Sequence, residues 1–174
     1  MRRTDLIDRS SGGLPRIPPA WSARADEQKD IEQTSLGGTL SESVADPTIG
    51  LFMNDGTGAK LDYYLDNSIS VIPGSCLPDG RRRLEVTVTM RYDAPTSGLP
   101  TYVLGEMRGG KPYVLQTNVI LYAPVGGGLT EIVQDGKPVG VMRGEDRSRE
   151  VGQITVRLRP GQTTVLKSAV VAPI

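Results

Sequence analysis

The residues of this chain whose types and spacing could do chemistry gather in one short stretch, residues 54–66. Oxygen-bearing side chains on a glycine-rich turn are ligands that calcium accepts, and two nearby carboxylates can act as an acid/base pair. Asp55 and Asp62 are the carboxylates that such a pair would use. The order Asn-Asp-Gly-Thr-Gly does not fit a calcium loop, which needs acids at alternate positions, then glycine, then a distant Glu. The candidate oxygen ligands are Asn54, Asp55, Asp62 and Asp66.

A structural turn is the simpler interpretation of the same stretch. Asn and Asp side chains accept hydrogen bonds from backbone amides two residues further on, and Gly56 or Gly58 can adopt positive φ without a Cβ clash. The turn would join two strands, with the head of Lys60 in solvent or paired with an aspartate. Its apolar neighbours Phe52, Leu61 and Tyr64 would anchor it to the sandwich. The residues of this candidate motif are Asn54, Asp55, Thr57, Lys60, Asp62, Tyr63 and Tyr64.

The amino-acid content and the spacing of residues argue against other kinds of catalytic or ligand-binding site. The chain has no histidine, which removes Ser-His-Asp and Cys-His pairs and His-ligated metals. Cys76 is the only cysteine, so neither an intramolecular disulfide nor a cysteine cluster can form. The triple glycine at 126–128 is followed by neither a Lys-Ser/Thr pair nor a helix, so it does not fit a phosphate loop. The charged run 143–150 is expected to be a solvated loop with local ion pairs. We therefore expect no cofactor and no metal.

Charge and hydropathy indicate which kinds of partner, nucleic acid or membrane, the chain is expected to lack. The 174 residues include 20 basic and 20 acidic side chains, a formal net charge of +0. A nucleic-acid-binding protein needs a basic face that displaces counterions, so we expect no nucleic-acid partner. No stretch reaches the roughly 18 apolar residues of a membrane helix. The first residues also lack the apolar segment of a signal peptide.

Three regions are predicted along the chain. Residues 1–20 are polar and rich in Gly and Pro, which is typical of a disordered arm. Residues 21–47 form a short helix and a loop, with the helix over 23–34 after a cap at Ser22. The apolar stripe of this helix is thin, so it should be peripheral. Residues 48–174 form a β-sandwich domain.

The β-sandwich prediction comes from period-two alternation between turns. The chain has 21 glycines and 13 prolines, which favours many turns over long helices. In the clearest strand, Val88 lies on the core face and Thr87 on the opposite face. Strands are predicted at 61–72, 84–92, 113–122, 129–134, 138–142, 151–158 and 163–171. Short strands at this spacing predict an all-β fold: an immunoglobulin-like or fibronectin-like antiparallel β-sandwich with a short N-terminal helix and a disordered arm.

One segment is similar to a known family. Residues 50–65 read GLFMNDGTGAKLDYYL and resemble the F-x-N-D-x-T-x-x-K-x-x-Y-Y-L stretch of an uncharacterised bacterial family, domain of unknown function DUF 4012. Residues 121–127, 147–152 and 158–162 also resemble the end of actinobacterial members. Trp21-Ser-Ala together with Glu27-Gln28 is similar to the segment before the β-region there. The resemblance covers about residues 20–172.

The resemblance implies that the chain corresponds to one part of a longer protein. Members of the family carry an N-terminal membrane helix and a large region before the part that this chain resembles. They are expected on the outer side of the membrane, and their biochemical function is not established. The chain therefore looks like the C-terminal part of such a cell-envelope protein. The implied location is extracytoplasmic and membrane-associated, although this chain shows neither signal peptide nor membrane helix. The implied partner is the N-terminal region of a family member or another envelope protein.

The expected function is that of a non-enzymatic β-sandwich module with a structural or binding role. Two alternatives stay open. The first is an enzyme whose carboxylate site lies in residues 54–66, in an open cleft lined by Asp55, Asp62 and Lys60. The second is a remnant of a truncated gene without an independent role, which inspection of the upstream DNA would test.

Overall fold

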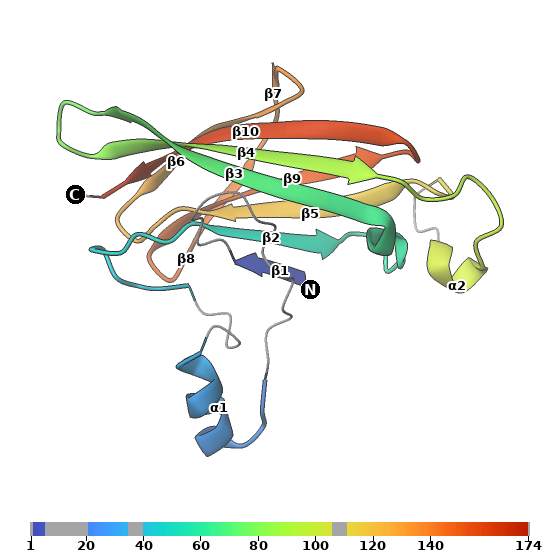
Figure 1. Ribbon diagram of the computed structural model, residues 1–174, viewed down its shortest axis with the longest axis horizontal. Helices are drawn as coiled ribbons and strands as arrows, with labels where there is room; N and C mark the ends of the chain where they lie inside the picture. The colour runs from blue at the N-terminus through green and yellow to red at the C-terminus, as the bar shows by residue number, and fades with distance from the viewer. Residues whose placement is uncertain (1, 6–20, 35–39, 106–110, 174) are drawn as a thin grey trace.

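Two antiparallel sheets pack face to face in the computed structural model, which describes residues 2–5, 21–34, 40–105 and 111–173 (Figure 1). The strand order of the first sheet is β1-β2-β5-β9-β8. Its strands are β1 (Arg2–Asp5), β2 (Gly50–Asp55), β5 (Leu115–Tyr122), β9 (Arg149–Leu158) and β8 (Met142–Asp146). The all-β sandwich prediction is confirmed.

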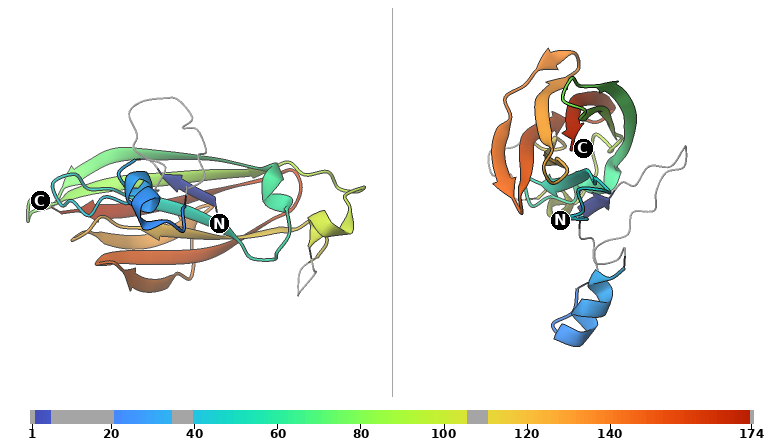
Figure 2. Two further views of the ribbon diagram at one scale, coloured as in Figure 1. Left: turned by 90° about the horizontal axis from the view of Figure 1, so that it is seen from below. Right: turned by 90° about the vertical axis from the view of Figure 1, so that its left-hand side faces the viewer.

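The second sheet covers the first along its whole length, and the end-on view shows the two layers facing each other (Figure 2). Its strand order is β3-β4-β10-β6-β7. Its strands are β3 (Leu65–Cys76), β4 (Arg82–Tyr92), β10 (Gln162–Ala172), β6 (Gly128–Gln134) and β7 (Lys137–Pro138). The molecule has the two-layer architecture of immunoglobulin-like domains. In its second sheet the last strand, β10, lies between β4 and β6.

Strand β4 shows how the alternating pattern produces the core. It pairs with β3 on one side and with β10 on the other. Val86, Val88 and Met90 are buried between the sheets, whereas Thr87 is half-buried on the outer face. The predicted half-exposed strand is confirmed. Strand β5 repeats the pattern, and its buried inner residues are Leu115, Thr117, Val119 and Leu121.

The hairpin between β6 and β7 turns between the predicted strands 129–134 and 138–142, but β7 is only Lys137–Pro138 and residues 139–141 are not in a strand. Asp135 and Gly136 both have positive φ, 50° and 81°. An Asp-Gly pair tolerates this conformation in a two-residue hairpin turn, and its right-handed twist matches the flanking strands.

The charged run 143–150 differs from the solvated loop that we expected, because it contains part of a hairpin. Residues 142–146 form the edge strand β8, which pairs with the start of β9. Arg147 and Ser148 make the two-residue turn, with φ of 48° and 58°. Neither residue type favours positive φ, so the sequence carries no turn signal there. Pairing of β8 with β9 overrides that local preference.

Two further segments differ from their predictions. Residues 61–64 were expected to begin a strand, but they form the 3₁₀ helix η2 (Leu61–Tyr64), and β3 starts only at Leu65. The strand then continues through Pro73, where we expected it to end, with an irregular register at that point. A proline can lie in an edge strand because its missing N–H faces away from the ladder. Residues 101–104, which lie between predicted strands, form the short helix α2 (Thr101–Leu104).

The N-terminal regions agree with their predictions in part. Residues 2–5 form β1, which pairs antiparallel with β2, so this part of the predicted disordered arm is a strand. Residues 6–20 lie outside the described residues. Helix α1 (Ala25–Glu32) is shorter than the predicted 23–34 and buries no residue, as its thin apolar stripe predicted. It stands away from the sandwich in Figures 1 and 2. Ser22 accepts the Arg24 N–H and donates to Glu27, which orders the entry to the helix.

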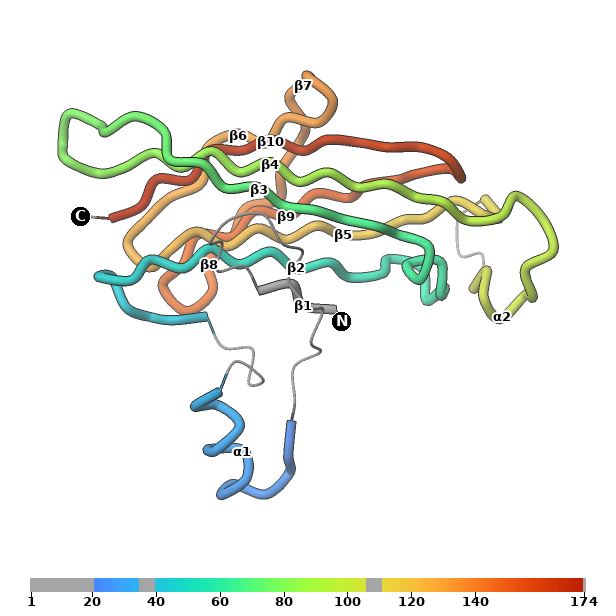
Figure 3. Tube along the Cα trace, in the orientation of Figure 1, coloured from blue at the N-terminus to red at the C-terminus, as the bar shows by residue number. Residues whose placement is uncertain are grey.

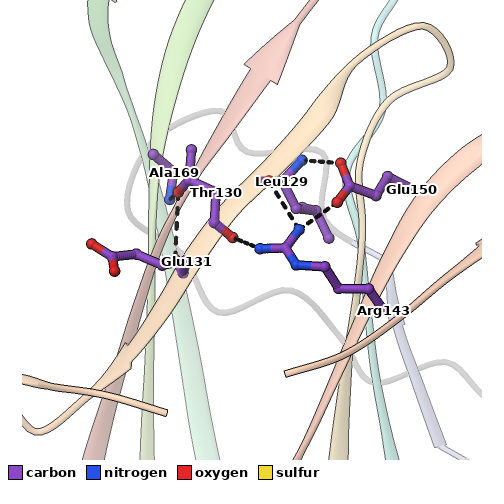
Figure 4. A network of polar contacts seen from close by, with 6 residues as sticks. All are labelled: Leu129, Thr130, Glu131, Arg143, Glu150 and Ala169. Atoms are coloured by element: carbon purple, nitrogen blue, oxygen red, sulfur yellow. Dashed lines mark hydrogen bonds and ion pairs between the residues drawn. The ribbon is translucent and has the colours of Figure 1, made fainter. Parts of the chain in front are cut away.

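One edge of the sandwich is closed by a polar network between the two sheets (Figure 4). Leu129 of β6 donates its N–H to Glu150 of β9 at 2.8 Å, and its carbonyl accepts from Arg143 of β8 at 3.1 Å. Arg143 also donates to the carbonyl of Thr130 at 2.7 Å and pairs with Glu150. Side chains of the first sheet therefore satisfy backbone groups at the edge of the second, because β7 is too short to pair with them.

Arg149 is the second departure from the predicted solvated loop. Its side chain is only 2% exposed. The guanidinium donates to the carbonyls of Thr48 at 2.9 Å and Ala123 at 3.0 Å, and to the carbonyl of Ser41. A guanidinium offers five donors in a fixed fork, so one side chain can hold three backbone oxygens. Arg149 thus fastens the segment before β2 to the first sheet.

Candidate functional site

The candidate motif lies at one end of the sandwich, where β2 ends and the chain crosses to β3. The trace in Figure 3 places this connection at the same end as the segment around α2. The Thr57 N–H donates to Asp55 Oδ1 at 3.1 Å, and the Thr57 hydroxyl donates to the same oxygen at 2.8 Å. The Ala59 N–H in turn donates to Thr57 Oγ1 at 3.3 Å. The carboxylate of Asp55 thus accepts the backbone amide two residues further on, as an Asx turn requires.

Asn54 contributes through its backbone instead of the side chain that we expected. Its carbonyl accepts a hydrogen bond from the Thr117 hydroxyl at 3.2 Å, which ties the end of β2 to β5. The Asn54 side chain is exposed, because it lies on the outer face of its strand.

Lys60 and Tyr102 join the motif to α2. The Lys60 N–H donates to the carbonyl of Val103 at 2.8 Å, and Lys60 Nζ lies 5.1 Å from the centre of the Tyr102 ring. This cation–π contact replaces the aspartate pairing that we considered from sequence. Gly105 ends α2 with φ of 75°, and a Cβ there would lie 2.9 Å from backbone atoms of Ala59. The close approach requires glycine.

The tyrosine pair of the motif does not alternate across a strand. Tyr63 and Tyr64 lie in η2, with ring centres 5.2 Å apart and nearly perpendicular. Tyr63 is 75% exposed, whereas Tyr64 is half-buried and its carbonyl accepts the Asp93 N–H. Leu61 is buried and anchors the turn, as we expected. Asp62 is half-buried in the same turn.

Tyr92 and Tyr113 lie beside the motif and were not singled out in the sequence. Tyr92 is fully buried and donates its hydroxyl to the carbonyl of Tyr113 at 3.2 Å. Tyr113 has φ of 64° in the turn 111–114, where Pro112 precedes it. This matches a type II turn, whose third position favours glycine, so the backbone is strained there. The Tyr113 hydroxyl accepts the Leu99 N–H at 3.2 Å and so holds the loop before α2.

Burial, together with the neighbouring Tyr64, raises the pKa of Tyr92 from 10.0 to about 12. Between these values the unfolded chain releases the Tyr92 proton and the folded chain retains it, so the stability present below pH 10 is lost as the pH rises. We expect Tyr92 to account for a loss of roughly 2–3 kcal/mol in the free energy of unfolding over this range. Denaturant unfolding of the wild type and of Tyr92→Phe, compared from about pH 9 to about pH 12, measures this. A stability difference between the two proteins that does not change with pH would contradict the assignment.

A hollow of about 310 Å³ opens next to the motif, between β5 and the β9–β10 turn. Arg157 and Arg159 line it, and both side chains are exposed while Leu158 between them is buried. Alternation along a strand places both arginines on one face, a signal that is present in the sequence. The described residues that line it are Thr57, Lys111, Val114, Gln116, Arg157, Leu158, Arg159 and Gln162.

No family model, curated protein or solved structure matches the chain. In the part of the chain that the structure describes, no three acidic or cysteine side chains gather in a way that could hold a metal ion. The same described residues include no helix with the length and hydrophobicity needed to cross a bilayer.

Proposed function

We propose that the chain is a non-enzymatic β-sandwich module with a structural or binding role, similar to the C-terminal part of a DUF 4012 protein of the cell envelope. The long antiparallel scaffold supports a module of this kind, because the motif and the segment around α2 lie together in connections at one of its ends. The motif is also the segment with the most specific resemblance to that family. Its partner would be another region of such a protein or a second envelope component.

The observation that carries this proposal is how the polar side chains of the motif are used. One oxygen of Asp55 accepts two hydrogen bonds from Thr57, and the Thr57 hydroxyl then accepts the Ala59 N–H. The Lys60 ammonium lies over the Tyr102 ring. These groups shape the loop and dock α2 onto it. A nucleophile or general base would instead direct its lone pairs at a space that a substrate can enter.

Substitution of Asp55 tests the structural role. Asp55→Asn should retain most of the stability, because the amide oxygen still accepts the Thr57 N–H. Asp55→Ala should lower the free energy of unfolding by about 1–2 kcal/mol, the usual scale for losing such hydrogen bonds. Thermal melts of both variants, with calcium and with a chelator, measure the effect. Asp66→Ala, at an exposed carboxylate of β3, is the matched control and should change stability by no more than about 0.5 kcal/mol.

The same melts can contradict the proposal. A metal-dependent role predicts that calcium raises the melting temperature of the wild type and that this rise disappears in Asp55→Asn. A charge-dependent activity that Asp55→Asn abolishes without loss of stability would also favour the enzyme alternative.

A further inference from the structure

The hollow beside the motif has an unusual balance of charge. Among the described residues that line it, three are cations, Lys111, Arg157 and Arg159, and none is a carboxylate. The whole chain has equal numbers of acidic and basic residues, so this local excess does not follow from the composition.

Some arginines elsewhere in the molecule have carboxylate partners, which these three cations lack among the described residues. Arg81 pairs with Asp79, and Arg91 pairs with Asp93. Among the described residues, no carboxylate forms an ion pair with Lys111, Arg157 or Arg159. The nearby Asp55 is not among the residues that line the hollow, and one of its oxygens accepts two hydrogen bonds from Thr57. A cluster of like charges without counter-ions is unfavourable by itself and is relieved by a bound anion.

The two glutamines that line the hollow keep side-chain N–H donors after their oxygens are bonded. Gln116 Oε1 accepts from Arg157 Nε at 2.7 Å, which orients the guanidinium and leaves its terminal nitrogens available. Gln162 Oε1 accepts the Arg159 N–H at 2.7 Å. Each glutamine thus uses its acceptor inside the protein and keeps its amide N–H groups. The site offers donors from four side chains, in addition to the Lys111 ammonium.

We propose that this hollow binds a phosphate dianion, carried by a small phosphomonoester. A dianion balances a three-cation site better than a singly charged phosphodiester does, and arginine binds phosphate oxygens in bidentate geometry. The volume of about 310 Å³ lies at the lower end of the range of ligand sites, which suits a small molecule. The turn 111–114, strained at Tyr113, carries Lys111 to the rim.

Titration of the protein with methyl phosphate, followed by NMR of the side-chain N–H groups, tests the site. We expect saturable shifts for Arg157, Gln116 and Gln162. Dimethyl phosphate, the matched monoanion, should bind at least about tenfold more weakly. Binding of methyl phosphate should also weaken from about pH 7.5 to about pH 5, because the second pKa of a phosphomonoester is about 6.

Matched variants separate the site from general charge effects. The double variant Arg157→Gln and Arg159→Gln should weaken methyl phosphate binding at least about tenfold, and Lys111→Gln about threefold. The control is Arg82→Gln and Arg83→Gln, which removes the same charge at the opposite end of β4, where Arg82 pairs with Ala172. It should leave the affinity within about twofold.

Three results would overturn the site: shifts that rise linearly without saturation, equal binding of the two phosphate esters, or equal losses in the site variant and the control. All substituted side chains are exposed, so well-dispersed spectra are expected, and Lys111→Gln remains a test if the double variant does not fold. The hollow would bind phosphate whatever family the chain belongs to, so a failed titration leaves the structural role of the motif intact.

Discussion

Arg149→Met is expected to lower the free energy of unfolding by about 3 kcal/mol or more. The variant keeps most of the apolar stem but leaves the carbonyls of Ser41, Thr48 and Ala123 without their donor. Each buried acceptor that loses a charged donor costs on the order of 1–3 kcal/mol, and water can rescue only part of that loss.

Chemical denaturation of three variants isolates this effect. Arg149→Lys should lie between the wild type and Arg149→Met, because a compact ammonium cannot reach three carbonyls in the fork geometry of a guanidinium. Arg147→Met removes the same charge from an exposed turn two residues away and should change stability by no more than about 0.5 kcal/mol. If Arg149→Met and Arg147→Met lose the same stability, the three carbonyls do not depend on Arg149.

Val88→Asp should unfold the domain, with an expected loss of more than about 4 kcal/mol. Val88 is buried between the sheets at the centre of β4, opposite Ile69 of β3 and Leu166 of β10. A carboxylate there would have no hydrogen-bonding partner and would displace apolar packing on both sides. The far-UV and near-UV circular dichroism of the variant, together with its denaturant midpoint, would show the loss.

Thr87→Asp is the matched control one residue away. Thr87 lies on the outer face of β4, and its neighbour across the sheet is Lys167 of β10. A carboxylate at this position stays partly in solvent near that ammonium, so we expect a change of less than about 1 kcal/mol. Similar losses for Val88→Asp and Thr87→Asp would mean that β4 is buried on both faces.

The sequence predicts those elements in which local pattern and tertiary environment agree. Strand β4 alternates cleanly and lies where it is predicted, and so does the Asp-Gly turn between β6 and β7, although β7 ends at Pro138 and does not fill the predicted strand 138–142. Strand β8 has no buried residue, and Arg147 and Ser148 occupy turn positions that they do not favour. Its formation depends on pairing with β9 along the charged run, and no local signal encodes that pairing.

In the candidate site, too, contacts between residues close in sequence are predictable, whereas contacts that depend on the tertiary fold are not. The bond from the Thr57 N–H to Asp55 spans two residues, so local turn chemistry predicts it. The cation–π contact of Lys60 with Tyr102 joins residues that are distant in sequence, and it depends on how α2 docks. The phosphate hollow likewise combines the start of β5 with the end of β9. The alternation at Arg157 and Arg159 was visible in the sequence, but the position of Lys111 beside them was not.

The hydrogen bonds of Arg149 to the carbonyls of Ser41, Thr48 and Ala123 also have a mechanical consequence. Strand β2 lies near the edge of its sheet and would peel away bond by bond if tension reached it directly. The segment that precedes β2 is attached at Ser41 and Thr48 to a side chain of β9, which pairs with β5 on one side and β8 on the other. Tension that enters through residues 41–48 therefore meets Arg149 before it reaches β2, and part of it passes to β9. A module that joins two parts of a larger assembly would benefit from this attachment, because β9 carries part of a pull on the segment before β2.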